Sequence, residues 1–495
     1  MLRNRTVMLF SPQFVAESAQ SGAGYRATPP LSHLALAGPL REAGYSVRIV
    51  DTKWDSDWRR LLREEIDDLA CVGITSLTGP AVRNGLEISA FARSLNPRVP
   101  IIWGGWHSTF AAQQAIEDPL VDVVVRGMGE RTLIEVLQAL STGSSLRGIP
   151  GVHAREDGEM LATPDRDVED INHFPPPAYD LIDPARYITK SSNGVRMAAT
   201  IFSRGCPFAC DFCLDSRNKW LGLGVDRMIA DMKFWIDRGA NHIRFYDGNF
   251  FLGRPRIVEF CNAILKNELQ TKVRWIATAV GNRVVQMDDD LLALLKRSGL
   301  TQVAIGAESG SDELLARITN KTTTEATLDS VRRLTRHGIN QYLFFMVGYP
   351  DEPASALEET LELALRAKQI NPNVELFLNF TTPLPGSEVF RIAVERGYVE
   401  APRVFADWAR FDYLRPNLLP ITPKYERIVN RFQRYLGFAF PSGTRGPLAS
   451  ALKLPIRKAA QWRLKRGYYD FPLEIAASNT LHTAAKAVSR LLRVE

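Results

Sequence analysis

The sequence predicts an α/β protein of two units, a doubly wound parallel sheet followed by a partial (β/α)6 barrel, with a mainly helical C-terminal region. Short apolar runs alternate with amphipathic segments twice along the chain, and a proline-bearing stretch separates the two alternations. The chain has 495 residues, of which 45% are hydrophobic, so it can bury two or three cores. We place the four segments at 1–141, 142–194, 195–400 and 401–495.

The first alternation has the rhythm of a doubly wound sheet. Strands are expected at 6–10, 46–50, 70–75, 100–103 and 121–125, and helices at 32–43, 57–67, 81–95, 108–116 and 130–140. Such sheets bind ligands at the carboxyl ends of their strands.

Glycine and hydroxyl residues follow three of these strands. Thr75, Ser76 and Thr78 come after the third strand, Gly104 and Gly105 after the fourth, and the sequence GMGE at 127–130 after the fifth. Glycine lets a ligand approach the backbone, and hydroxyls can hydrogen-bond a polar tail. Each group alone is typical of an ordinary turn, but three at corresponding positions favour a ligand site.

The segment 142–194 differs in composition from its neighbours. A small hairpin is expected around 151–161, and a polar stretch then leads to three successive prolines at 175–177. Because prolines interrupt helix and strand alike, we expect an extended spacer and a domain boundary here.

The second alternation predicts the barrel. Strands are expected at 196–202, 242–246, 273–279, 302–306, 341–347 and 374–380, with helices between them. Six β/α units in this length suggest an incomplete barrel rather than another open sheet.

The last segment, 401–495, loses the strand rhythm and is expected to be helical. Apolar residues recur at helical spacing over 425–439, and 451–466 carries six Lys or Arg residues, with Pro455 expected to interrupt a long surface helix. With a formal net charge of +6, the basic tail is compatible with peripheral contact with an anionic membrane. The alternative is a helix that packs over the barrel mouth and leaves a solvated basic face.

Cysteine usage and hydropathy indicate a cytoplasmic protein. The chain has only five cysteines, so few that a secreted disulfide framework is disfavoured. The N-terminal apolar run is too short for the core of a signal peptide, and no apolar stretch approaches the length that crosses a bilayer.

Three of the cysteines, Cys206, Cys210 and Cys213, lie on one predicted loop after the first barrel strand. Closely spaced cysteinates are typical of iron–sulfur sites, because soft thiolates suit iron and a short loop can wrap the cluster. Three cysteines would hold a [4Fe–4S] cluster and leave its fourth iron open to a small ligand. A zinc site usually needs a second ligand pair, which is not found nearby, and a redox dithiol would not use the third cysteine.

The CxxxCxxC spacing, with the aromatic Phe212 before its last cysteine, resembles the radical S-adenosylmethionine (SAM) superfamily. The resemblance implies that SAM chelates the open iron and is cleaved to methionine and a 5′-deoxyadenosyl radical, which takes hydrogen from the substrate. It also implies an electron donor such as flavodoxin or ferredoxin.

Three later strand ends resemble SAM-binding positions of that superfamily. The sequence YDGN at 246–249 occupies the place of a glycine-rich ammonium-binding motif, from which it departs; we assign that role to Asp247. Glu308 in the fourth strand motif is expected near SAM, and Gly348 in the fifth is expected to meet adenine through its backbone. Each position alone is equally typical of a residue at a strand end that is solvated or that caps a helix.

The first unit resembles the cobalamin-binding domain that precedes the barrel in one branch of this superfamily. The residues that carry the resemblance are PLSHLALA at 30–37, LREAGY at 40–45, VRIVD at 47–51 and the pair Gly104 and Gly105, and with the barrel it covers about 5–400. It implies that Thr75, Ser76 and Thr78 face the nucleotide tail and that the loop 11–30 lies over the corrin. The histidine motif Asp-x-His-x-x-Gly is absent, so cobalt would lack a histidine ligand; a sheet that binds nothing is the alternative.

The resemblance implies methylation of an unactivated carbon of a hydrophobic metabolite such as a lipid, a tetrapyrrole or another natural product. Phe411 and the five residues after it, DYLRP, resemble relatives that act on such molecules. Cyclisation, ring contraction or oxidation are alternatives. An RNA methylthiotransferase is disfavoured because those enzymes add an N-terminal domain with three more cysteines, whereas residues 1–141 contain only Cys71. We therefore expect a small-molecule substrate, no nucleic acid, and a monomer.

Overall fold

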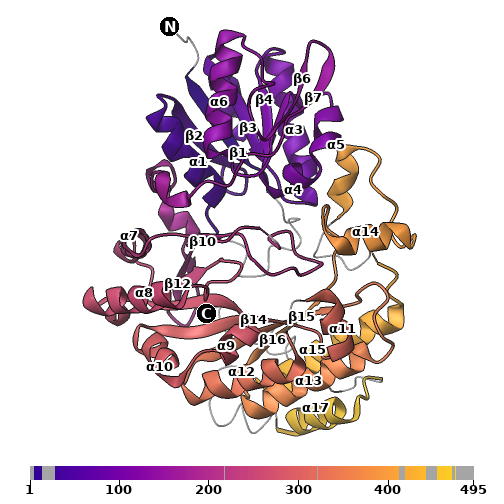
Figure 1. Ribbon diagram of the computed structural model, residues 1–495. Helices are drawn as coiled ribbons and strands as arrows, with labels where there is room; N and C mark the ends of the chain where they lie inside the picture. The colour runs from indigo at the N-terminus through magenta and orange to yellow at the C-terminus, as the bar shows by residue number, and fades with distance from the viewer. Residues whose placement is uncertain are drawn as a thin grey trace, which may run out of the picture.

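Figure 1 shows the computed structural model, in which the N-terminal unit lies above the barrel unit. The structure describes residues 5–13, 28–216, 218–319, 322–411, 419–441, 454–470 and 474. Among these residues, no helix is long and apolar enough to cross a membrane. Most of the predicted corrin-covering loop and all of the sequence DYLRP lie outside the described residues.

The first sheet confirms the predicted doubly wound order. Its parallel strands run β2-β1-β3-β4-β5, with bounds β1 Thr6–Ser11, β2 Ser46–Asp51, β3 Leu69–Thr75, β4 Ile101–Gly104 and β5 Val123–Val125. The helices are α1 Leu31–Glu42, α2 Trp58–Glu65, α3 Pro80–Leu95, α4 Gly105–Phe110, α5 Ala112–Glu117 and α6 Gly129–Thr142. The single helix expected at 108–116 is therefore two short ones.

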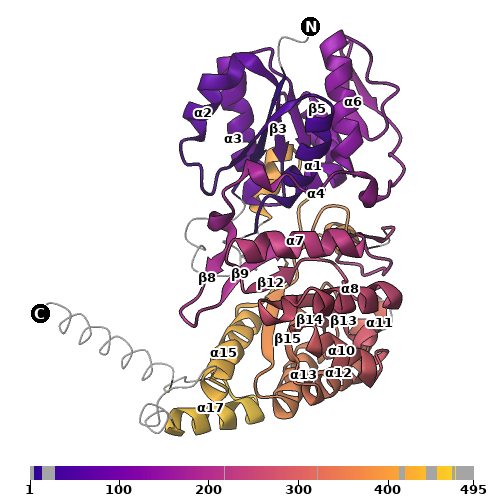
Figure 2. The same ribbon diagram turned by 90° about the vertical axis from the view of Figure 1, so that its left-hand side faces the viewer.

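Both faces of this sheet are covered, which explains its continuous apolar strands. In β1, Val7 and Leu9 pack with residues of α1 and α6, whereas Met8 and Phe10 pack with residues of α2 and α3. Figure 2 shows these helix pairs on opposite sides of the sheet.

The predicted hairpin belongs to the first sheet rather than to the linker. Strands β6 Val152–Glu156 and β7 Glu159–Ala162 form it, and β6 pairs antiparallel to β5, which extends the sheet to seven strands. Val152 and Ala154 are fully buried, so burial of this face fixes the hairpin against the sheet.

The remaining linker is docked against both units and is not the extended spacer that we expected. The Tyr179 ring stacks on Phe234 at 4.4 Å, and its hydroxyl donates to Asp231 Oδ2 at 3.1 Å, so this end of the linker packs on the barrel helix α7 Val225–Asp237. Tyr187 donates to Asp51 Oδ2 at 2.9 Å at the end of β2.

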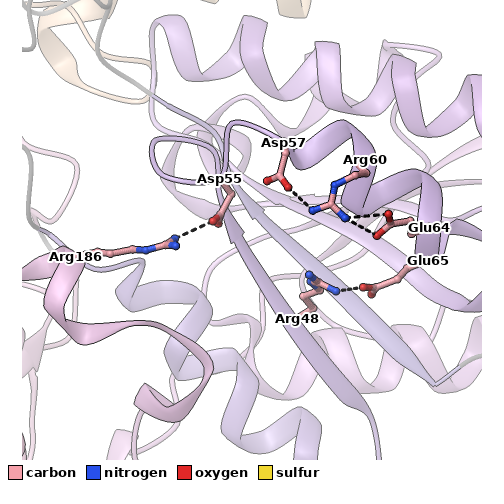
Figure 3. A network of polar contacts seen from close by, with 7 residues as sticks. All are labelled: Arg48, Asp55, Asp57, Arg60, Glu64, Glu65 and Arg186. Carbon is pink, nitrogen blue, oxygen red and sulfur yellow. Dashed lines mark hydrogen bonds and ion pairs between the residues drawn. The ribbon is translucent and has the colours of Figure 1, made fainter.

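Ion pairs reinforce the contact with the first unit. Figure 3 shows Arg186 of the linker paired with Asp55 at 2.9 Å, beside one ion pair that joins β2 to α2 and two local pairs between residues 57 and 64 of α2 and its N-cap. Arg41 of α1 also pairs with Asp180 of the linker at 2.7 Å. Because these pairs are exposed, each contributes little alone, and the two buried tyrosines define the docking.

The second sheet confirms the six predicted parallel strands in chain order and curls into a half-barrel. The strands are β9 Arg196–Thr200, β12 His242–Phe245, β13 Arg274–Val280, β14 Leu300–Glu308, β15 Asn340–Val347 and β16 Glu375–Phe380, with the short β8 Thr189–Lys190 antiparallel to β9. Helices cover its outer face: α7, α8 Arg254–Lys266, α10 Asp289–Arg297, α12 Thr324–Arg336 and α13 Ala356–Ile370.

The C-terminal segment is divided between the two units. After α14 Glu388–Glu395, the 3-10 helix η7 Phe405–Arg410 packs on the first unit, where Phe405 meets the Trp103 ring at 5.1 Å. Helices α15 Pro423–Ala439 and α17 Leu454–Arg466 pack on each other below the barrel, so the predicted helices form, but not as one region. Pro455 lies in the first turn of α17, where a missing N–H is tolerated and no interruption occurs.

Candidate active site at the barrel mouth

The cysteine loop is held at its base by a short hairpin. Strand β10 Ser203–Arg204 pairs antiparallel to β11 Leu221–Gly222, and the Cys206 N–H donates to the Asp215 carbonyl at 3.2 Å. Gly205 has φ +72, and a Cβ there would collide with the carbonyl oxygen of Lys219. The loop therefore requires glycine directly before its first cysteine.

The three cysteines form no disulfide among the described residues and have restricted access to solvent. Cys206 is buried, and Cys210 and Cys213 are half-buried. Burial raises the pKa of Cys206 and raises that of Cys213 to about 11, so the thiolates need a nearby positive charge such as iron supplies.

The donor set fits a cluster better than a single metal ion. No three His, Cys, Asp or Glu side chains of the described residues converge closely enough to hold one ion. Three separated thiolates on one loop suit the corners of a cluster, whereas structural zinc needs converging ligands.

Asp247 fastens the second barrel strand to this loop. Its fully buried carboxylate accepts hydrogen bonds from the Ser203 hydroxyl and, at 3.2 Å, from the Phe202 N–H. Burial raises the pKa of Asp247 to about 6. Both oxygens are thus engaged by the loop, and the role of Asp247 toward the SAM ammonium stays a prediction.

Asn249, two residues further on, was missed by the sequence reasoning. It is fully buried, and neither Nδ2 nor Oδ1 has a hydrogen-bond partner among the described residues. The neighbouring Gly248 lies beside Cys206, since a Cβ built on it would be 4.0 Å from the Cys206 Cβ. Buried amides are normally satisfied, so an unpartnered one beside the loop fits a polar ligand. Its position in the same YDGN sequence was the available signal.

Glu308 ends β14 in a strained conformation. Its φ is +56, and the strand register shifts between Gly306 and Glu308, so the side chain turns back over Gly306 and leaves no room for a Cβ there. Burial raises the pKa of Glu308 to about 7, and its charge acts on Cys213. The carboxylate therefore lies near the cysteine loop, as predicted for a residue near SAM.

The end of β15 is tied to the C-terminal helix. The Gly348 N–H donates to the Tyr425 hydroxyl at 2.8 Å, and Tyr425 donates to Glu352 Oε1 at 2.7 Å. The N–H of Gly348 is thus already engaged by α15, an arrangement that no local sequence signal predicted. Phe212 packs beside this strand end against Leu314, Ile318 and Tyr349, where it anchors the cysteine loop.

The predicted cobalamin-tail residues converge at the carboxyl edge of the first sheet. Ser76 donates from its N–H to the Gly104 carbonyl at 3.2 Å, and its hydroxyl lies 3.2 Å from that of Ser108. Gly105 has φ +89, and a Cβ there would collide with Thr75 Oγ1. The close approach at Gly105 makes a cradle of the kind that a ligand tail needs.

The Thr78 hydroxyl is hydrogen-bonded to a histidine, His107, which the sequence analysis did not single out. The hydroxyl lies 3.1 Å from Nδ1 of the buried His107, whose ring stacks on Phe405 of η7 at 5.3 Å. Burial lowers the pKa of His107 to about 3, so the ring is neutral. In the first turn of α1, His33 is also buried beside the Phe10 backbone, and burial lowers its pKa to about 4. The Gly105 cradle fits a polar cofactor at this edge.

The two sites are joined by one ion pair. Arg204, two residues before Cys206, pairs at 2.6 Å with Glu130, which is buried at the start of α6. The third predicted glycine-rich strand end, 127–130, therefore contacts the cysteine loop directly.

Two family models match the chain. The Radical SAM superfamily model matches residues 200–364, and the B12 binding domain model matches residues 25–137. The matched ranges contain the cysteine loop with the half-barrel strands β12 to β15, and the strands β2 to β5 of the first sheet.

Two curated proteins are similar over most of their length. An uncharacterized methyltransferase of Pyrococcus horikoshii is 29% identical over 398 residues, 78% of this chain and 82% of that protein. An anaerobic magnesium-protoporphyrin IX monomethyl ester cyclase of Rubrivivax gelatinosus is 28% identical over 452 residues, 87% of this chain and 77% of that protein.

Among solved structures, the cobalamin-dependent SAM radical enzyme OxsB, with aqua-cobalamin and SAM bound, superposes with a TM-score of 0.71. The superposition covers 98% of this chain and 76% of that chain at 18% identity, so it shows a shared fold.

Proposed function

Because this chain belongs to the radical SAM superfamily and carries a B12-binding domain before its barrel, we propose that it is a cobalamin-dependent methyltransferase of an unactivated carbon in a hydrophobic small molecule. The observation that carries the proposal is the juxtaposition of the cysteine loop with the first sheet through the Arg204–Glu130 pair. When bound, the cluster supplies the electron that cleaves SAM, and cobalamin carries the methyl group.

The protein's own residues hold and orient these groups. Cys206, Cys210 and Cys213 would ligate the cluster, and Asp247 keeps the loop in place through Ser203. Asn249, after β12, and Glu308, at the end of β14, would contact SAM from two strand ends on either side of β13, and Thr75 and Gly105 would contact the cobalamin tail.

A radical cyclisation is the second candidate. It is favoured by the similarity to the cyclase, which spans 87% of this chain, whereas methylation is favoured by the similarity to the Pyrococcus methyltransferase. Product analysis separates the two reactions, because only methylation transfers the SAM methyl carbon to the substrate.

Anaerobic reconstitution tests the proposal. With iron, sulfide and a corrinoid, the protein should gain cluster absorbance, retain the corrinoid, and form 5′-deoxyadenosine from SAM when an external donor such as reduced flavodoxin or ferredoxin is present. Cys210→Ala should abolish cluster absorbance and SAM cleavage. Cys261→Ala, which removes a buried thiol on the far side of the barrel sheet, is the matched control and should retain both.

Two results would contradict parts of the proposal. An unchanged cluster in Cys210→Ala would reject the assigned ligand set. A cluster without retained corrinoid would reject methylation through cobalamin but not the radical chemistry.

The proposal also includes a monomer whose α17 touches an anionic membrane. Trp462 is 54% exposed, and exposed basic residues surround it on α17: Arg457, Lys458, Lys465 and Arg466. Co-sedimentation with anionic but not neutral vesicles is expected, with loss in Trp462→Ser, and equal recovery with both vesicles would reject the contact.

A further inference from the structure

The inner face of the half-barrel sheet carries aromatic side chains and an arginine. Along β12, Ile243 and Phe245 are fully buried beneath the outer helices, and along β15 Leu343 and Phe345 are buried in the same core. Because successive side chains of a strand point to opposite faces, the intervening residues point inward. These inward residues are Arg244, Tyr342 and Phe344.

The inward residues of β15 and β16 form an aromatic wall. The Phe344 and Phe377 rings stack at 5.2 Å with an angle of 20°, and the Tyr342 ring lies 5.6 Å from Phe377. Phe377 remains 38% exposed, as does Tyr246 at the end of β12. Exposed aromatic rings gathered on one concave sheet face are typical of a surface that binds an apolar molecule.

Arg244 places a cation beside this wall. Its guanidinium lies 5.2 Å from the Tyr246 ring centre and 5.6 Å from that of Tyr342. Its guanidinium forms no ion pair and no side-chain hydrogen bond with the described residues. Glu375, which also acts on Tyr342, instead accepts a hydrogen bond from the Gln302 amide at 3.2 Å.

Arg244 lies on the strand that is fastened to the cysteine loop. It lies within β12, and Asp247, which fastens the cysteine loop, comes two residues after this strand ends. An anion bound by Arg244 would therefore lie deeper in the half-barrel than the loop, with the rest of the molecule along the aromatic wall.

We propose that the substrate is an apolar, ring-bearing or long-chain molecule with one carboxylate or phosphate group, held by the aromatic wall and by Arg244. A half-buried guanidinium forms charge-assisted, often bidentate bonds with these anions, and the flanking rings keep its plane oriented. That the bound molecule is the substrate rests on the proposed function.

A matched pair of fluorescent probes tests the charge preference. Anilinonaphthalene sulfonate is an apolar aromatic anion, and phenylnaphthylamine has the same rings without the charge. Arg244→Gln should weaken binding of the sulfonate by about tenfold and leave binding of the amine unchanged. Phe377→Ser should weaken both probes, because it removes part of the apolar wall.

Arg238→Gln is the control variant, since Arg238 also lies over an aromatic ring, Phe234 at 3.5 Å, but on the outer helical side. It should change neither affinity. Equal affinity of the sulfonate for the wild-type protein and Arg244→Gln would overturn the proposal, as would an equal loss for the uncharged probe.

Displacement of the sulfonate identifies the anion. Decanoate and decyl phosphate should displace it better than decanol, and the better competitor shows whether a carboxylate or a phosphate is preferred. If neither exceeds decanol, the proposed anion recognition is wrong.

The probe experiment is independent of the radical chemistry. Probe affinity is measured at equilibrium and does not require cleavage of SAM. Failure of the wild-type protein to cleave SAM would reject the proposed function, whereas equal affinity of the sulfonate for the wild-type protein and Arg244→Gln would reject only the substrate class.

Discussion

At the residue scale, Asn249 offers a test in which stability and activity change in opposite directions. Its unpartnered buried amide costs about 1–3 kcal/mol, so Asn249→Leu should raise the unfolding temperature of the unloaded protein. If the amide binds SAM, the same variant should raise the KM for SAM at least about tenfold in 5′-deoxyadenosine formation.

The control for this prediction is Asn371→Leu. Asn371 is also buried, but its amide donates to Gln341 Oε1 at 2.8 Å, so the variant should lose stability without changing the KM for SAM. A lower unfolding temperature with an unchanged KM in Asn249→Leu would show that the amide has only a structural role.

Single residues were predictable where their chemistry is local. The cysteine loop was recognised from spacing alone, since its three cysteines lie within eight positions. The partner of Asp247 was not, because Ser203 lies 44 positions earlier and meets it only when β9 and β12 pair. For the same reason, the contact between Tyr425 and Gly348 could not be inferred from either sequence segment.

At the element scale, the docking of the linker on α7 should make stability depend on pH. Asp231 accepts hydrogen bonds from Tyr179 at 3.1 Å and from Thr200 at 3.3 Å, and burial raises its pKa to about 6. The folded state thus binds the proton more tightly than the unfolded chain does. The charged carboxylate destabilises the fold above about pH 6, and this penalty is relieved as the pH falls toward 4.

Asp231→Asn should remove this penalty while keeping an acceptor for both hydroxyls. We expect its free energy of unfolding to exceed that of the wild type by on the order of 1–3 kcal/mol at pH 7.5 and by less at pH 5. Chemical denaturation of the unloaded protein at both pH values measures the difference. Asp237→Asn, an exposed carboxylate on the same helix, should show no such pH-dependent difference, and an equal gain at both pH values in Asp231→Asn would contradict the assignment.

Helices and strands were predicted well because their periodicity is local. The way in which they pack against one another was not predicted, because it depends on residues far apart in the sequence. The hairpin β6–β7 was expected from its turn, but its addition to β5 depends on pairing across some 30 residues. A mainly helical region was expected over 401–495, but not the short helix η7, whose Phe405 contacts Trp103 about 300 positions earlier.

At the scale of the whole molecule, the two units are held by a linker, by η7 and by the Arg204–Glu130 pair. The first two contacts lie along the sides of the first unit, whereas the ion pair lies at the cysteine loop. The pair is therefore a direct contact through which the first unit can influence cluster assembly.

The two partners of this pair are not equally exposed, so we expect removal of one to cost more stability than removal of the other. The Glu130 side chain is 4% exposed and that of Arg204 is 35% exposed. Arg204→Gln leaves a buried carboxylate without its cation and should destabilise the protein by about 3–5 kcal/mol, whereas Glu130→Gln leaves a cation that can reach water and should cost less. The double variant should cost less than the sum of the two, because the second change removes the unpaired charge.

Thermal unfolding of the unloaded protein measures these differences, and loss of cluster absorbance in air measures their effect on the loop. Arg204→Gln should lose its cluster fastest, since the loop then lacks its contact with α6 and meets an unpaired negative charge. Additive effects in the double variant, or equal cluster lifetimes in all four proteins, would show that the pair does not link the two units. A larger effect in Glu130→Gln would mean that burial of the carboxylate does not determine the cost.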